Sequence, residues 1–236
     1  MGTTRARTIL ALGGGGFLME PDNPRLDDAI LEATGKDHPR IGLLPTPSAD
    51  SERVIARFYD AFARKAEAWH LPLFQRDREV AQLLEQDAIF VSGGNTANAL
   101  VIWRRHGVDA VLRQAWEAGI VLAGVSAGAI CWFEDGLTDS FGPELAPLGD
   151  GLGWLPGSFC PHYDGESKRR PRYTSLVDAG ALPPGLALDD GVAARFEGTE
   201  LVELVASRPS AAAWRVAPGA HEALPIRRLG SRLTGR

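Results

Sequence analysis

Apolar runs of strand length alternate with amphipathic stretches of helix length through the first two thirds of the chain. Within those stretches apolar residues recur every three or four positions, as in the stripe of Val54, Phe58 and Phe62, which we expect to face a core. This alternation predicts parallel strands joined by crossover helices, and therefore an α/β fold with a mostly parallel sheet flanked by helices. The expected strands are residues 8–12, 40–44, 71–74, 88–92 and 120–125, and the expected helices are residues 25–34, 51–69, 96–105 and 109–118.

The pattern changes beyond Phe159, where short strand candidates follow one another through tight glycine or proline links. They cover residues 187–190, 192–196, 201–206 and 212–216, and such close spacing predicts antiparallel strands appended to the parallel sheet. We therefore expect one α/β domain over residues 1–218. Residues 219–236 are basic and interrupted by glycine, which is typical of a flexible C-terminal tail.

Composition narrows the classes of function. The formal net charge is -5 and 44% of the 236 residues are hydrophobic, which argues against disorder and against a nucleic-acid partner. Cys131 and Cys160 are far apart, so neither a disulfide framework nor a zinc site is expected, and a cytoplasmic location follows. No run approaches the roughly 20 apolar residues of a membrane span. We expect a small peptide or other small molecule as partner and no metal. The sequence is compatible with a homodimer but does not determine the oligomeric state.

A G-x-S-x-G pattern places Ser126 between an apolar run that predicts a buried strand and a run that predicts the start of a helix. A strand that turns abruptly into a helix strains its pivot residue, and the small neighbours Gly124, Ala127 and Gly128 relieve the crowding. In that context a serine hydroxyl is exposed at the carboxyl edge of a sheet. Ser126 is therefore the predicted nucleophile.

Two glycine-rich turns follow other predicted strands. The segment Ser-Gly-Gly-Asn-Thr at 92–96 opens a helix, so the N–H of Gly94 could join that of Ala127 as an oxyanion hole, alongside a helix-capping role for Asn95. Glycines 13–16 follow the first strand, but their spacing does not match a dinucleotide-binding fingerprint. No nucleotide cofactor is expected, and a role for these glycines in lining a pocket stays open.

A serine nucleophile needs an imidazole to take its proton, and two histidines compete for that role. His162 lies at the entrance of a polar loop directly after an apolar run, where α/β enzymes place working residues. His221 would instead give the α/β-hydrolase order of Ser126, Asp190 and His221, typical of an esterase. Asp190 and Asp139 are the alternative carboxylates that could orient the base.

Three blocks together resemble the peptidase E family, the aspartyl dipeptidases related to cyanophycinase. They are Gly-Val-Ser-Ala-Gly-Ala at 124–129, Ser-Gly-Gly-Asn-Thr at 92–96 and Cys-Pro-His-Tyr at 160–163. The resemblance implies a fold like the class I glutamine amidotransferase domain, which is flavodoxin-like, with Ser126 as nucleophile and His162 as base. It implies Asp190 as the triad acid, where glutamate is usual, and Asp139 matches another acidic position of the family.

The resemblance also implies which residues contact the substrate. A basic residue that accepts the aspartyl carboxylate follows the histidine block, and Lys168 matches it, with Arg169 adjacent. Gly93, Asn95 and Asp139 complete the expected substrate-binding set. Because lysine lacks the bidentate fork of arginine, selectivity for an N-terminal aspartate would be weakened or absent. We expect a cofactor-free serine peptidase that forms an acyl-enzyme; the alternatives are the esterase and a peptide-binding homologue without turnover.

Overall fold

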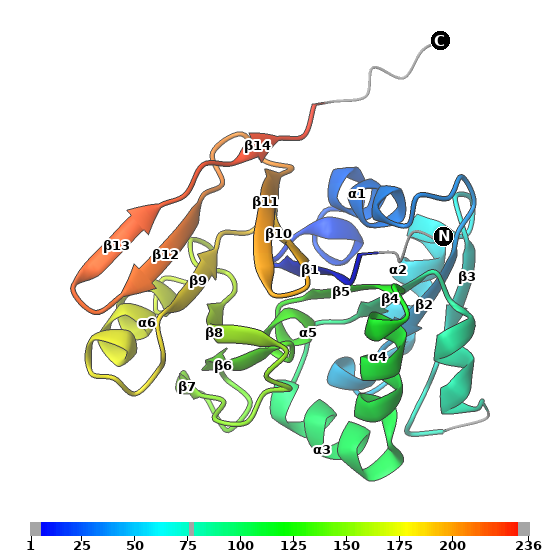
Figure 1. The fold of residues 1–236 in the computed structure, drawn as a ribbon, viewed down its shortest axis with the longest axis horizontal. Coiled ribbons are helices and arrows are strands. Elements are labelled where there is room, and N and C mark those ends of the chain that lie inside the picture. The colour runs from blue at the N-terminus through cyan, green and yellow to red at the C-terminus, as the bar shows by residue number, and fades with distance from the viewer. Residues whose placement is uncertain (1–5, 76–77, 231–236) are drawn as a thin grey trace.

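The computed structural model describes residues 6–75 and 78–230, and its centre is an eight-stranded sheet (Figure 1). Five strands run parallel, in the order β1, β5, β4, β2 and β3. Two antiparallel strands, β10 and β11, extend the sheet on the side of β1, and β14 pairs with β11. The bounds are β1 Thr8–Leu12, β2 Arg40–Leu44, β3 Glu67–His70, β4 Ala88–Val91, β5 Val121–Val125, β10 Val192–Glu197, β11 Glu200–Ala206 and β14 Arg227–Arg228.

Both faces of this sheet are buried, which explains why its strands are continuous apolar runs. Successive residues of β1 point to opposite faces, so Ile9 packs into one core and Leu10 into the other. Phe58 of α2 belongs to the same core as Leu10, whereas Trp103 of α3 belongs to the core of Ile9. The helices are α1 Arg25–Ala33, α2 Glu52–Phe62, α3 Thr96–His106, α4 Val108–Glu117, α5 Ala127–Ile130 and α6 Arg169–Asp178. The predicted α/β class with a mostly parallel sheet is confirmed.

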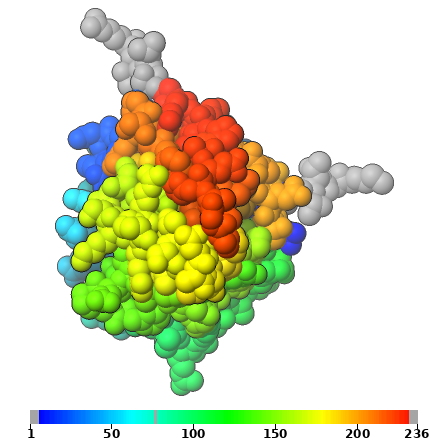
Figure 2. All heavy atoms as spheres, turned by 90° about the vertical axis from the view of Figure 1, so that its left-hand side faces the viewer, coloured from blue at the N-terminus to red at the C-terminus, as the bar shows by residue number. Residues whose placement is uncertain are grey.

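A second, six-stranded sheet lies beside the first and was not anticipated. Its order is β13, β12, β9, β8, β6 and β7, with β8 parallel to both β6 and β9. Figure 2 shows the orange and red β12–β13 hairpin against yellow α6 on one face of the molecule. The bounds are β6 Phe133–Thr138, β7 Ala146–Pro147, β8 Leu155–Cys160, β9 Gly185–Leu188, β12 Ala213–Ala217 and β13 Ala220–Ala223.

Three expected elements differ in the structure. The helix expected over 51–69 ends at Phe62, because residues 67–70 pair with β2 as strand β3. Residues 71–74 are not a strand, since the carboxylate of Asp50 accepts the N–H groups of Leu73 and Phe74. The tail expected from residue 219 is wrong as far as residue 228, where β13 pairs with β12 and β14 with β11. Residues 231–236 lie outside the described residues.

Across the described ranges, no helix is both long enough and apolar enough to span a bilayer. The parallel strands all point their carboxyl ends to one edge of the large sheet. The turns that follow β1, β4 and β5 therefore meet at that edge, and they carry the glycines and the serine singled out in the sequence.

Candidate active site

Ser126 occupies the sharp turn between β5 and α5, as predicted. Its backbone has a positive φ of 54° with ψ of -113°, a conformation outside the left-handed helical region that residues with a side chain adopt rarely. The two glycines of the motif allow this turn. A Cβ at Gly124 would collide with the carbonyl oxygen of Gly128, and a Cβ at Gly128 would collide with that of Val91. Strained backbone that its surroundings hold in place is typical of functional sites.

Three consecutive carbonyl groups at the end of β1 tie the candidate triad together. Leu12 O accepts the N–H of Ser126 at 3.1 Å, and Gly13 O accepts the N–H of His162 at 3.0 Å. Gly14 O accepts the N–H of Gly191, which directly follows Asp190, also at 3.0 Å. Residues from positions 126, 162 and 190 are thus fixed to neighbouring points of a single strand end, although they are far apart in the sequence.

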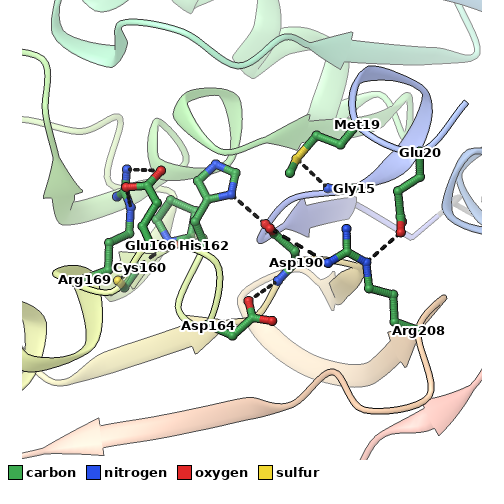
Figure 3. Close-up of polar contacts among 11 residues, drawn as sticks. Gly15, Met19, Glu20, Cys160, His162, Asp164, Glu166, Arg169, Asp190 and Arg208 are labelled. Atoms are coloured by element: carbon green, nitrogen blue, oxygen red, sulfur yellow. Dashed lines mark hydrogen bonds and ion pairs between the residues drawn. The ribbon is translucent and has the colours of Figure 1, made fainter.

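His162 and Asp190 form the shortest link of the site. Nδ1 of His162 lies 2.6 Å from Oδ1 of Asp190, and the two side chains are 15% and 9% exposed (Figure 3). His162 also has a positive φ, 52°, which is uncommon for a residue with a side chain. The backbone N–H of Asp190 donates to Oδ1 of Asp164 at 2.8 Å. With the Nδ1–H directed at the carboxylate, Nε2 of His162 is the free nitrogen that can accept a proton.

Two glycines pack directly against this carboxylate. A Cβ at Gly14 would overlap Oδ1 of Asp190 and lie 2.8 Å from Nδ1 of His162. On the other side, a Cβ at Gly165 would lie 2.6 Å from Oδ2 of Asp190. Sequence reasoning left the role of the glycines at 13–16 open and did not single out Gly165. The signal available for Gly14 was its position directly after the first strand, next to the strand of the predicted nucleophile.

The two alternatives for base and acid are not supported. His221 hydrogen-bonds through Nε2 to the Tyr163 hydroxyl at 2.9 Å and stacks on Trp214 at 4.4 Å between ring centroids. Its burial, with a smaller effect of Arg170, lowers its pKa. The carboxylate of Asp190 contacts His162 and not His221, so the geometry does not support the esterase order that required His221. Asp139 is exposed, and Asp190 rather than Asp139 bonds the imidazole.

The turn after β4 lies beside Ser126, as the oxyanion-hole prediction requires. β4 and β5 are paired, and a Cβ at Gly93 would lie 3.6 Å from Cβ of Ser126. In the part of the chain that the structure describes, the N–H groups of Gly94 and Ala127 have no hydrogen-bond acceptor. Gly94 has φ of 139°, and a Cβ there would collide with the carbonyl of Pro47.

Two of the expected substrate-binding residues serve the fold instead. Asn95 caps α3, since its Oδ1 accepts the N–H of Asn98 at 2.8 Å while its Nδ2 donates to Ser140 O at 2.9 Å. Arg169 is 3% exposed, because it pairs with Glu166 at 2.7 Å and donates to Leu137 O. Arg169 is therefore closed to a peptide, whereas Asn95 is half-buried with both ends of its amide engaged. Lys168 is exposed and lines a cavity of about 240 Å³ together with Glu144, Leu145 and Arg172. Asp139 is exposed, and Gly93 is half-buried beside Ser126.

Both cysteines are buried beside the site and are poor nucleophiles. Burial raises the pKa of the Cys131 and Cys160 thiols well above the usual range, so the thiolate is scarce at neutral pH. Among the described residues, no group of three or more histidine, cysteine, aspartate or glutamate side chains could hold a metal ion. A cavity of about 500 Å³ lies instead at the amino ends of β1 and β5, away from Ser126.

The arrangement agrees with what comparisons with known proteins find. The model of peptidase family S51 matches residues 9–204. The chain is 50% identical over 231 residues to "Uncharacterized peptidase YgaJ" of Bacillus subtilis, covering 95% of this chain and all of that protein. It is 29% identical over 173 residues to a peptidase E of Streptomyces coelicolor, covering 69% and 70% of the two chains.

A solved peptidase from an acI-B1 Actinobacterium has the same fold, with a TM-score of 0.67 at 18% identity over 94% of this chain and 96% of that one. The family match spans the turn of Ser126, the loop of His162 and the strand end of Asp190. The resemblance expected from the sequence is therefore confirmed. The chain belongs to peptidase family S51, the family that includes peptidase E.

Proposed function

We propose that this chain is a serine peptidase that hydrolyses small peptides through an acyl-enzyme formed on Ser126, with His162 as base and Asp190 as the acid that orients it. One observation carries the proposal: the 2.6 Å contact between His162 and Asp190 stands beside a serine with a strained φ of 54°. Membership of peptidase family S51 supports the reaction class. A carboxylate fixed on Nδ1 selects the tautomer whose Nε2 can act as general base.

In the first half of the reaction, Oγ of Ser126 attacks the scissile carbonyl carbon and Nε2 of His162 takes the hydroxyl proton. Asp190 stabilises the imidazolium that forms, without being protonated itself. The imidazolium then gives the proton to the leaving amine as the C–N bond breaks, which leaves an ester on Ser126. In the second half, water attacks this ester through the same base, and the acid product and free serine are released.

The oxyanion of each tetrahedral intermediate needs hydrogen-bond donors that are not already engaged. The backbone N–H groups of Gly94 and Ala127 meet this condition within the described residues and flank Ser126. Glycine at position 94 lets the chain adopt the φ of 139° found there and pass close to the carbonyl of Pro47, where a Cβ would collide. Loss of such a donor typically costs about 10²- to 10³-fold in rate.

The proposed substrates include dipeptides with an N-terminal aspartate. Lys168 begins the loop-to-helix junction of α6 and is exposed, so its ammonium group is available to an acidic side chain. Arg169 is held in the interior by Glu166 and leaves Lys168 as the cation that we assign to substrate. Because a lysine ammonium group is a point charge and cannot form the bidentate hydrogen bonds of an arginine, we expect a modest rather than strict preference for aspartate.

A dipeptide library that varies the N-terminal residue tests the proposal. We expect hydrolysis that Ser126→Ala reduces by at least about 10³-fold with an unchanged circular dichroism spectrum. The control is Ser51→Ala, since Ser51 precedes α2 without a side-chain capping bond, and it should keep full turnover. Equal turnover by Ser126→Ala would contradict the proposal. Peptide binding without any turnover by the wild type would favour the non-catalytic homologue.

A further inference from the structure

Arg208 lies behind the candidate triad, just beyond the end of β11 and outside residues 9–204 that the family model matches. Its Nε lies 2.6 Å from Oε1 of Glu20, and its NH1 lies 3.9 Å from Oδ2 of Asp190 (Figure 3). The other carboxylate oxygen of Asp190 is the one that contacts His162. Glu20, Arg208 and Asp190 therefore form a line of alternating charge that ends at the imidazole of His162.

The surrounding backbone is shaped to hold Arg208 in this place. Its side chain crosses Gly191, where a Cβ would lie 2.7 Å from Cγ of Arg208, so the path exists only because residue 191 is glycine. Gly15 similarly approaches Glu20, since a Cβ there would lie 3.0 Å from Oε2. Ser207 fixes both partners, because its N–H donates to Gly191 O at 2.8 Å and its hydroxyl lies 3.3 Å from Oε2 of Glu20.

Other charged groups near the pair are engaged elsewhere or are negative. Asp164 accepts the backbone N–H of Asp190, and Glu166 is paired with Arg169. The carboxylate of Asp189 accepts the N–H of Ala212 at 2.8 Å. Among the described residues, Arg208 is the one cation within 4 Å of the Asp190 carboxylate. Its removal would leave that carboxylate among negative groups only.

We propose that Arg208, oriented by Glu20, is a positioning residue that holds the Asp190 carboxylate against His162 and opposes protonation of the imidazole. This inference rests on the proposed function, in which neutral His162 is the base. The guanidinium favours the charged carboxylate and disfavours a second cation on the imidazole. Because Arg208 is 34% exposed, solvent screens part of this effect.

Removal of the charge of Arg208 and removal of the charge of Glu20 should shift the pH–rate profile in opposite directions. Arg208→Gln removes the cation, so His162 is protonated more readily and the acid limb of the pH–rate profile moves up by about half to one pH unit. Glu20→Gln keeps an oxygen acceptor for Nε of Arg208 but removes an opposing negative charge, so the acid limb moves down. Arg208→Lys keeps the charge and should leave the limb near its wild-type position. A purely structural role would not give shifts of opposite sign.

The pH dependence of Ser126 labelling by a fluorophosphonate tests this without the natural substrate. Arg227→Gln is the matched control, because its Nε also lies 2.6 Å from a glutamate, Glu203, yet it contacts no member of the triad. We expect the upward shift for Arg208→Gln, with a maximal rate reduced by about tenfold, the downward shift for Glu20→Gln and no shift for the control. Superimposable profiles for all variants, or shifts of the same sign for both, would overturn the inference.

An NMR titration of the His162 ring, assigned by its loss in His162→Gln, separates this inference from the proposed function. If the wild type is not labelled at any pH while the imidazole titration moves with opposite signs in the two variants, the positioning role stands and the serine peptidase proposal falls. If Ser126 is labelled but neither the profile nor the titration moves, the positioning role falls and the proposed function stands.

Discussion

Replacement of Gly14 by alanine should separate activity from stability, because this glycine packs against the bond between His162 and Asp190. The added methyl group would overlap Oδ1 of Asp190 and lie 2.8 Å from Nδ1 of His162 and 2.9 Å from Cγ of Asp190. Ordinary van der Waals contact begins near 3.4 Å, so the imidazole must move by several tenths of an ångström and the overlapped carboxylate oxygen by more than about 1 Å. The 2.6 Å hydrogen bond cannot survive with a methyl group between its partners.

The size of the loss follows from the role of that bond. Misplacement of a catalytic group by about 1 Å costs about 10²-fold, and loss of the acid that orients the base costs about 10⁴-fold. Gly14→Ala should therefore lower the rate of fluorophosphonate labelling of Ser126 by about 10²- to 10⁴-fold. Gly14 does not have a positive φ, so no backbone strain adds to the effect on stability.

The assay compares labelling rates with thermal unfolding followed by circular dichroism. Gly149→Ala is the control, since Gly149 has φ of 83° with nothing within 4 Å of a new Cβ and lies away from the triad. That variant should lose about 1 kcal/mol of stability and no activity. A Gly14→Ala protein that labels within threefold of the wild type would refute the argument that this glycine is required by the His162–Asp190 contact.

Three further outcomes follow from buried groups. Burial raises the pKa of Asp27 to about 7, although its Oδ1 accepts the N–H of Phe17. Between pH 4 and 7 the folded state therefore holds a proton that the unfolded state releases near pH 4. The free energy of unfolding falls as the pH rises through this range. Asp27→Asn removes the cost of a buried charge at position 27, so at pH 8 it should be more stable than wild type by up to on the order of 4 kcal/mol, with little difference at pH 4. Urea denaturation measures both differences, and an equal difference at the two pH values would contradict the prediction. His221→Phe, which can keep the stacking on Trp214, should retain labelling of Ser126, and a loss comparable to that of His162→Ala would restore the esterase order. The buried cysteines should not react with Ellman's reagent (5,5′-dithiobis(2-nitrobenzoic acid)) until the protein unfolds, so rapid reaction of two thiols in the native protein would contradict their burial.

Periodicity located the large sheet well and the small sheet poorly. Each core strand of the large sheet is buried on both faces, so its sequence is a continuous apolar run that is visible without any partner. Strands of the small sheet are not continuous apolar runs: β8, Leu155–Cys160, contains proline and glycine, and β13, Ala220–Ala223, is largely exposed and carries a histidine and a glutamate. Their pairing depends on distant strands, and local sequence does not encode it. The same reason explains residues 67–70, which read as helix but pair with β2.

In the candidate site, too, features encoded by neighbouring residues were predictable and features that depend on distant segments were not. The strained turn at Ser126 is encoded locally by its own glycines, and the sequence was sufficient to predict it. The choice of His162 over His221 rested on its loop and on a family resemblance, since the contact with Asp190 spans 28 positions. Asn95 and Arg169 were expected at the substrate, but the structure uses them for a helix cap and a buried ion pair. Hydrogen-bond partners made by remote segments cannot be derived from residue type alone.

Peptide mapping by mass spectrometry after fluorophosphonate treatment tests the central claim most directly. The account predicts one adduct per chain, on the peptide that contains Ser126, formed at least about 10³-fold more slowly in His162→Gln. An adduct on another residue, or labelling of Ser126 at a rate that does not depend on His162, would contradict it.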